Sequence, residues 1–97
     1  MRALTAEQRK YLKAQAHALK PVVMIGTQGL TEAVVKESER ALAAHELIKI
    51  RVLGDDRAVR EQHLESLCAT LDAAPVQHIG KLLLLYRPAD KPKLRLP

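Results

Sequence analysis

Two glycines, Gly26 and Gly29, enclose two polar residues where an apolar run gives way to an amphipathic pattern. The chain contains only four glycines, so a pair at this point requires an explanation. A glycine has no Cβ, so it allows a ligand to approach the backbone closely and tolerates a positive φ. If a helix begins just after Gly29, its free N–H groups and its dipole also attract an anion. The segment Gly26-Thr27-Gln28-Gly29 therefore predicts either an ordinary turn or a phosphate-binding loop.

Known nucleotide-binding loops do not match this segment. A P-loop requires GxxxxGK followed by Ser or Thr, and the dinucleotide fingerprint requires three glycines. A clamp on the backbone of a nucleic-acid strand, of the kind that GxxG loops of KH domains form, is compatible with the spacing. Thr27, Gln28 and Thr31 would add neutral hydrogen-bond donors, and Lys20 lies just upstream. Spacing alone does not decide between this clamp and a simple turn.

No other group of residues predicts catalysis or metal binding. Asp55-Asp56 could suggest magnesium, but the pair also fits a helix N-cap. Cys68 lies on an apolar stripe, and Ser38 and Ser66 lie inside predicted helices without an evident general base. The histidines lie on separate predicted elements, without Cys or His partners at ligand spacing: His17, His45, His63 and His78. We therefore expect no cofactor, no metal and no enzymatic activity, with a small nuclease as an alternative to test.

The distribution of charge favours a polyanionic partner. The net charge is +5, and the excess lies at the two ends: residues 1–29 and 81–97 each carry five basic residues and one acidic residue. The N-terminal block, which includes Lys13 and Lys20, leads directly into the glycine pair. Such basic segments are typical of nucleic-acid-binding proteins, although they also keep a protein soluble. The single cysteine fits a reducing compartment, and no apolar run resembles a signal peptide or membrane span, so we expect a cytoplasmic protein.

Residues 1–97 are expected to form one compact α/β domain, in which strands alternate with helices. Thr5 and Gln8 form a capping-box pattern at the start of the first helix, which Pro21 ends by about Lys20. The apolar run 21–25 predicts a strand buried on both faces. A helix from about residue 30 to His45 and a strand over 46–53 follow. The next helix is capped by Asp55 or Asp56, and its inner side carries Val59, Leu64, Leu67, Cys68 and Leu71. The last two strands, Pro75–Ile79 and Lys81–Arg87, are joined at Gly80-Lys81.

The resulting order is α-β-α-β-α-β-β, with a small mixed four-stranded sheet on which the helices pack. The wholly apolar run 82–85 predicts a central strand. Lys49 and Arg51 alternate with apolar residues, and this pattern fits either an RNA-facing surface or the protection of a sheet edge. The Pro-rich, basic tail, residues 88–97, is expected to be extended.

Several of these segments together resemble the bacterial YhbY family, the single-domain form of the CRM domain (chloroplast RNA splicing and ribosome maturation). The similarity rests on "LKPVVMIGTQGLTE", "HELIKIRV", "IGKLLLLYRP" and the closing "LRLP", in the same order and spacing over roughly residues 4–97. Gly26 and Gly29 fall on the family's GxxG motif, and Lys20-Pro21 falls on the preceding pair. The resemblance implies a fold similar to the C-terminal domain of translation initiation factor three, with a KH-like GxxG loop.

The resemblance also implies a function: RNA binding, in association with ribosomal RNA or precursor large ribosomal subunits. With only two tyrosines and no other aromatic residues, we expect phosphate contacts, rather than base stacking, to dominate. A protein–protein adaptor without direct RNA contact is the alternative. We expect a monomer without membrane or small-molecule partners. The residues expected to contact RNA are Lys13, Lys20, Gly26, Thr27, Gln28, Gly29, Thr31, Lys36 and Arg87.

Overall fold

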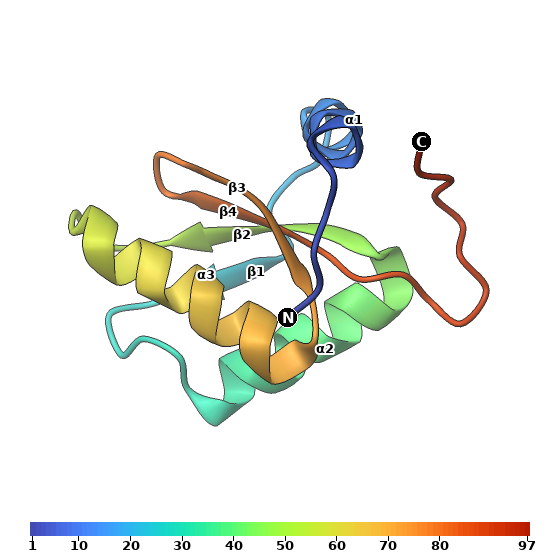
Figure 1. The fold of residues 1–97 in the computed structure, drawn as a ribbon. Coiled ribbons are helices and arrows are strands. Elements are labelled where there is room, and N and C mark those ends of the chain that lie inside the picture. The colour runs from blue at the N-terminus through green and yellow to red at the C-terminus, as the bar shows by residue number, and fades with distance from the viewer.

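One mixed sheet of four strands, in the order β1-β2-β4-β3, organises the protein (Figure 1). The computed structural model describes residues 1–97. Strand β1 runs parallel to β2, whereas β4 is antiparallel to both of its neighbours. The predicted element order and the mixed sheet are thus confirmed. The elements are α1 (Ala6–Ala16), β1 (Val23–Ile25), α2 (Glu32–His45), β2 (Leu47–Val52), α3 (Arg57–Leu71), β3 (Ala74–Ile79) and β4 (Leu82–Tyr86).

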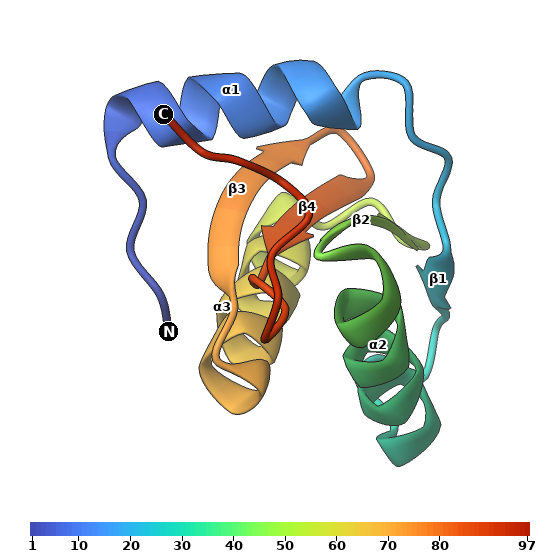
Figure 2. The ribbon, with the colours of Figure 1, turned by 90° about the vertical axis from the view of Figure 1, so that its right-hand side faces the viewer.

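The helices cover the two faces of the sheet unequally. Helices α2 and α3 lie on one face and α1 lies on the other (Figures 1 and 2). A core of 14 buried residues fills the space between the sheet and α2 and α3. A second cluster of six buried residues lies beneath α1. Because α1 is a single short helix, it covers only part of its face of the sheet.

Local sequence signals define the helix starts. The Thr5 side chain accepts the N–H of Gln8 at 3.0 Å, and the Gln8 side chain accepts the N–H of Thr5 at 3.1 Å. Asp56 accepts the N–H groups of Ala58 and Val59 at the start of α3. The capping box and the N-cap are both as predicted. These bonds satisfy backbone donors that the first turn of a helix leaves without partners.

The first helix ends a turn earlier than predicted, at Ala16 instead of near Lys20. Its last hydrogen bonds are of the tighter i→i−3 type, since His17 N–H bonds Ala14 O and Leu19 N–H bonds Ala16 O. Pro21 disfavours a helical conformation at the residue before it, and the preceding turn unwinds accordingly. As a result Leu19, which lies beyond the end of the helix, has 37% of its surface exposed.

Two predictions about burial are wrong. The first strand is buried on one face only: Val23 and Ile25 are buried, but Met24 is 54% exposed because α1 does not extend over this edge of the sheet. On α3, Val59, expected on the inner side, is 42% exposed, whereas the next residue, Arg60, is buried. The Arg60 guanidinium donates to the carbonyl of Gly54 at 2.9 Å and to Nε2 of His78 at 3.3 Å.

The position of β2 removes one alternative for its basic residues. This strand lies between β1 and β4, so Lys49 and Arg51 do not protect a sheet edge. Lys49 Nζ donates to the carbonyl of Leu19 at 2.8 Å, and Arg51 is exposed.

Strand β4 is central, as the apolar run 82–85 predicts. No helix in the structure has the length and apolar character needed to cross a membrane.

The C-terminal segment, residues 88–97, forms no helix or strand and returns alongside α1 (Figure 2). The buried carboxylate of Glu46 accepts the backbone N–H groups of Ala89, Lys93 and Leu94 at 2.7–3.2 Å. Burial alone would raise the pKa of Glu46, but these three hydrogen bonds and the charge of Lys93 outweigh it and lower the pKa. An ionised Glu46 therefore holds the tail in place.

Candidate nucleic-acid interface

The two glycines of the loop have different structural roles. The Gly29 N–H donates to the carbonyl of Gly26 at 3.0 Å and closes a tight turn whose central residues, Thr27 and Gln28, are exposed. Gly29 has a φ of 75°, which L side chains rarely adopt. Gly26 has no positive φ, and a Cβ at this position would meet no atom within 4 Å. The turn requires glycine at position 29, whereas glycine at position 26 leaves an open approach to the backbone.

The N-terminus of α2 begins just beyond this turn. The Oγ1 atom of Thr31 accepts the N–H of Val34 at 3.2 Å, so Thr31 is the N-cap of the helix. Its hydroxyl proton remains able to donate. The N–H groups of Glu32 and Ala33 have no protein acceptor. These free donors, together with the helix dipole, form an environment suited to an anion.

Two charged or titratable side chains lie next to the loop. Lys36 Nζ lies 3.1 Å from Oε1 of Glu32, one helical turn away, and both side chains are largely exposed. Such exposed pairs are weak and exchange partners readily. His63, on α3, lies against Gly29. His63 is 34 positions from Gly29 in the sequence, so no local pattern predicts this contact.

The structure separates the predicted RNA-contacting residues into two regions. Gly26, Thr27, Gln28, Gly29, Thr31 and Lys36 lie together at the loop and the first turns of α2. Lys13 lies on α1, which occupies the opposite face of the sheet (Figure 1). Lys20 lies in the segment that joins α1 to β1. Strand β1 therefore connects the region around Lys20 with the loop.

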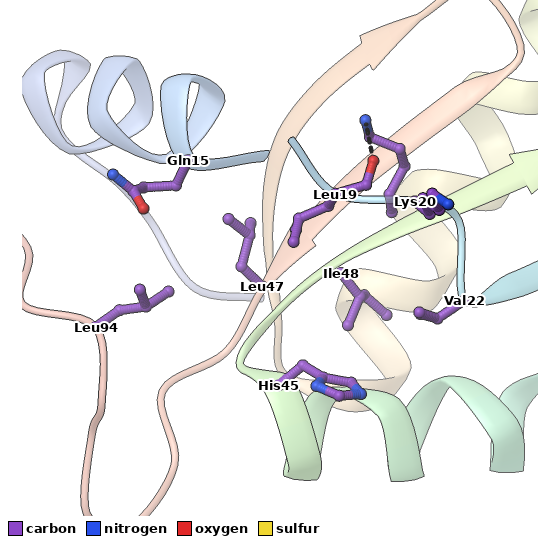
Figure 3. A pocket seen from close by; sticks show the side chains of 9 residues that line it. Gln15, Leu19, Lys20, Val22, His45, Leu47, Ile48 and Leu94 are labelled. Atoms are coloured by element: carbon purple, nitrogen blue, oxygen red, sulfur yellow. Dashed lines mark hydrogen bonds between the residues drawn. The ribbon is translucent and has the colours of Figure 1, made fainter. Parts of the chain in front are cut away.

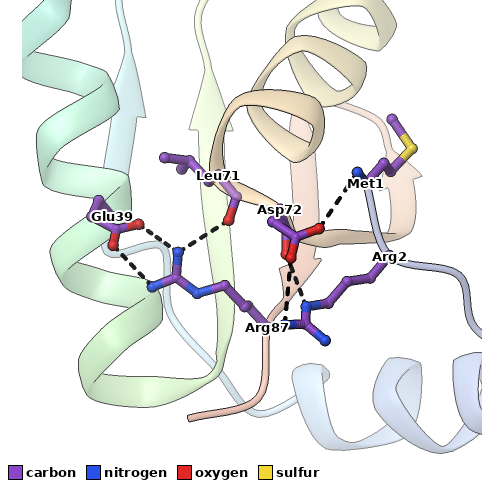
Figure 4. Close-up of polar contacts among 6 residues, drawn as sticks. All are labelled: Met1, Arg2, Glu39, Leu71, Asp72 and Arg87. Atoms are coloured by element: carbon purple, nitrogen blue, oxygen red, sulfur yellow. Dashed lines mark hydrogen bonds and ion pairs between the residues drawn. The ribbon is translucent and has the colours of Figure 1, made fainter. Parts of the chain in front are cut away.

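Arg87 belongs to neither region. Its guanidinium contacts both carboxylate oxygens of Glu39, at 2.5 and 3.2 Å, and donates to the carbonyl of Leu71 at 3.0 Å (Figure 4). Its side chain is only 18% exposed. The same figure shows Arg2 and the N-terminal amine bonded to Asp72, just after α3. Arg87 thus ties the end of β4 to α2 and α3.

The cysteine and Ser38, the other side chains with potential reactivity, are buried within the fold. Cys68 is fully buried, and burial raises the pKa of its thiol to about 12, which disfavours a thiolate nucleophile. The hydroxyl of Ser38 donates to the carbonyl of Val34 at 2.8 Å. No group of three or more His, Cys, Asp or Glu side chains is placed to hold a metal ion. The geometry of the loop and the start of α2 accordingly offers backbone and cationic donors for an anion.

Comparisons with known proteins agree with the resemblance noted in the sequence. The CRS1/YhbY (CRM) domain family matches residues 4–87. A curated RNA-binding protein of Haemophilus influenzae is 46% identical over 97 residues, which cover 100% of this chain and 98% of the relative. A Pseudomonas aeruginosa protein, also named for RNA binding, is 47% identical over 94 residues, which cover 97% of this chain and 90% of the relative.

A solved structure shows the same fold. The solution structure of SAV1595 from Staphylococcus aureus, described as an RNA-binding candidate, superposes with a TM-score of 0.86 at 31% sequence identity. The match covers 98% of this chain and 100% of that protein. The family match spans most of the chain, residues 4–87. The chain belongs to the CRS1/YhbY (CRM) domain family.

Proposed function

We propose that this protein binds ribosomal RNA, in association with precursor large ribosomal subunits, and assists their assembly as a cytoplasmic monomer without enzymatic activity. The names of the relatives support RNA as the partner class. The ribosomal target follows from the resemblance to the YhbY family. The observation that carries the proposal is the open backbone at Gly26, where no atom occupies the space of a Cβ.

In this proposal a phosphate group rests on the turn between Gly26 and Gly29. The exposed side chains of Thr27 and Gln28 supply polar groups beside this phosphate. The free N–H groups of Glu32 and Ala33 lie at the N-terminus of α2, which follows the turn directly. Thr31 contributes a hydroxyl donor, and Lys36 contributes a charge once it exchanges Glu32 for the phosphate. Contacts of this kind position an RNA strand without selecting a base sequence.

Substitutions at Gly26 test the clamp. Gly26→Asp places a carboxylate where the phosphate would rest, and Gly26→Asn adds a side chain of the same shape without the charge. We expect Gly26→Asp to weaken binding to precursor large subunits by about tenfold or more, because charge-assisted contacts are lost and repulsion is added. Gly26→Asn should lose less of this affinity, because it adds no negative charge. If both variants keep the wild-type unfolding midpoint and bind precursor particles like wild type, the loop does not hold the RNA.

An adaptor that binds protein rather than RNA is a second candidate, favoured by one observation. On the part of the sheet that α1 leaves open, Met24 is 54% exposed and Ile79 is 52% exposed. Met24 and Ile79 lie on the two edge strands, in one row across the sheet with Arg51 and Leu82 between them. Exposed apolar side chains on one face of a protein are a feature of contact surfaces. RNA affinity that is absent, or equal at low and high salt, together with retained binding to a ribosomal protein, would favour the adaptor.

A further inference from the structure

A groove separate from the GxxG loop lies between the end of α1, strand β2 and the end of α2 (Figure 3). Its volume is about 330 Å³. Leu19 and Val22, which line it, are 37% and 47% exposed. Leu47 and Ile48 form its floor and are buried in the fold. Leu94, from the C-terminal segment, also lines the groove, which therefore presents partly exposed aliphatic walls to solvent.

The charged groups that line this groove are all basic. Lys20 and Lys49 contribute ammonium groups, and His45 contributes an imidazole from the last turn of α2. Lys49 Nζ is fixed by its bond to the Leu19 carbonyl at 2.8 Å, which leaves two of its three donors available. No carboxylate lines the groove. The site thus combines apolar walls with a cationic rim, and the complementary ligand has an apolar part attached to an anion.

A nucleotide has this composition, because its base is flat with an apolar face and its phosphate is negative. Unpaired bases are held by stacking against aromatic or apolar side chains, while Lys residues contact the phosphates. The exposed amide of Gln15, also in the lining, has both a donor and an acceptor for the edge of a base. The β1 segment from Val22 to Gly26 joins the groove to the loop, a distance of roughly 13 Å at the usual rise of an extended chain.

We infer that the groove accepts one unstacked nucleotide of the bound RNA, with its base between Leu19 and Val22 and its phosphate near Lys20 and Lys49. This inference rests on the proposed function, since it takes RNA as the ligand. The loop at Gly26 would contact the backbone of any strand, whereas the groove requires a base that is free of its stack. The groove therefore confers a preference for bulged or single-stranded RNA over continuous duplex.

Two labelled hairpin RNAs test this inference. Binding is measured at about 50 mM salt, because phosphate contacts are strong at low salt and the affinity of both hairpins can then be determined. One hairpin is fully paired, and the other carries a single-nucleotide bulge in the same stem. Wild-type protein should bind the bulged hairpin more tightly. Val22→Ser removes one wall of the groove, and we expect it to reduce affinity for the bulged hairpin by about five- to tenfold, because the apolar contact of the valine methyl groups with the base is lost. Affinity for the paired hairpin should stay unchanged.

A matched control and a second variant separate binding from folding. Val59→Ser makes the same change at a valine of similar exposure on α3, outside the groove, and should affect neither hairpin. His45→Ala alters the groove at an exposed residue, and it should reduce the preference for the bulged hairpin without lowering the unfolding midpoint.

The outcomes are distinguishable from those of the loop proposal. Gly26→Asp should weaken binding of both hairpins alike, whereas the groove variants should change only the ratio between them. The inference is overturned if wild type binds the two hairpins equally or binds neither. It is also overturned if Val22→Ser and His45→Ala leave the ratio at the wild-type value, even where Gly26→Asp abolishes binding.

Discussion

The imidazole of His63 on α3 lies directly against Gly29, so that a Cβ at Gly29 would stand 3.5 Å from Cε1 of the ring. This distance is an ordinary van der Waals contact, and space alone does not require glycine there. The positive φ of 75° does. The contact joins the GxxG turn to the helix packed beside it, and α3 thereby supports a loop that belongs to another part of the chain.

The two glycines of the loop should differ in their effect on stability. We expect Gly29→Ala to lower the free energy of unfolding by about 1–2 kcal/mol, because alanine is strained at a positive φ. Gly26→Ala should have little effect or raise stability slightly, because its φ is unstrained and the unfolded chain loses freedom. Urea denaturation of both variants measures the difference. Equal midpoints for the two variants would contradict the distinct roles assigned to the glycines.

Lysines on the proposed interface should contribute to the salt dependence of RNA binding. We expect Lys13→Gln and Lys20→Gln each to reduce the slope of log affinity against log salt by about 0.7–0.9, the value for one lost phosphate contact. Lys81→Gln is a suitable control, since Lys81 pairs with Asp55 at 3.1 Å in a different region. Titrations of a labelled ribosomal RNA fragment at several salt concentrations provide the slopes. An unchanged slope for Lys13→Gln alone would exclude α1 from the interface.

Arg87 should affect stability and not RNA affinity. Lysine cannot reproduce the two-point contact with Glu39 together with the bond to the Leu71 carbonyl. We therefore expect Arg87→Lys to lower the free energy of unfolding by about 1–3 kcal/mol, the range for hydrogen bonds to charged groups. RNA affinity of the folded variant should match wild type. A folded variant with normal stability and weak RNA binding would show that Arg87 contacts RNA.

Glu46 should make the fold sensitive to acid. Its folded-state pKa lies below the ordinary value of 4.5, so ionised Glu46 stabilises the protein above that pH. This stabilisation is lost as the pH falls below 4.5 and through the folded-state pKa. Glu46→Gln should lower the free energy of unfolding at pH 7 by about 1–3 kcal/mol and flatten its decline in acid. Glu37→Gln, at an exposed position on the same helix, is the control, and a loss equal to that of Glu46→Gln would contradict this role.

Much of the fold follows from short-range signals in the sequence. The capping box at Thr5, the N-cap at Asp56, and the turn at Gly80 depend on residues within a few positions of one another, and the structure has all three. The alternation along 46–53 likewise predicts β2 and the burial of Ile48, Ile50 and Val52, although Leu47 is buried as well. Such signals are reliable because the interactions that they describe form within a single element.

The features that the sequence does not show depend on contacts between distant segments. Met24 is exposed because α1 does not extend over β1, and its neighbours in sequence do not encode where α1 lies. Val59 lies in the first turn of α3, where its side chain remains 42% exposed. The RNA contact expected of Arg87 stays a prediction, and its local sequence does not show that a carboxylate 48 positions away binds its guanidinium. Glu46 resembles an ordinary charged residue at a helix end, and only the returning tail makes it a buried acceptor.

By itself the sequence determined the element order, the family and the glycine pair at the start of a helix, since these depend on local spacing and composition. Only the tertiary structure decided which of the two glycines leaves the backbone open, which basic residues are free, and that Lys20 and Lys49 border an apolar groove. The physical reason is that a charge or an apolar side chain becomes available to a ligand only when packing leaves it without a partner. That condition depends on the whole fold.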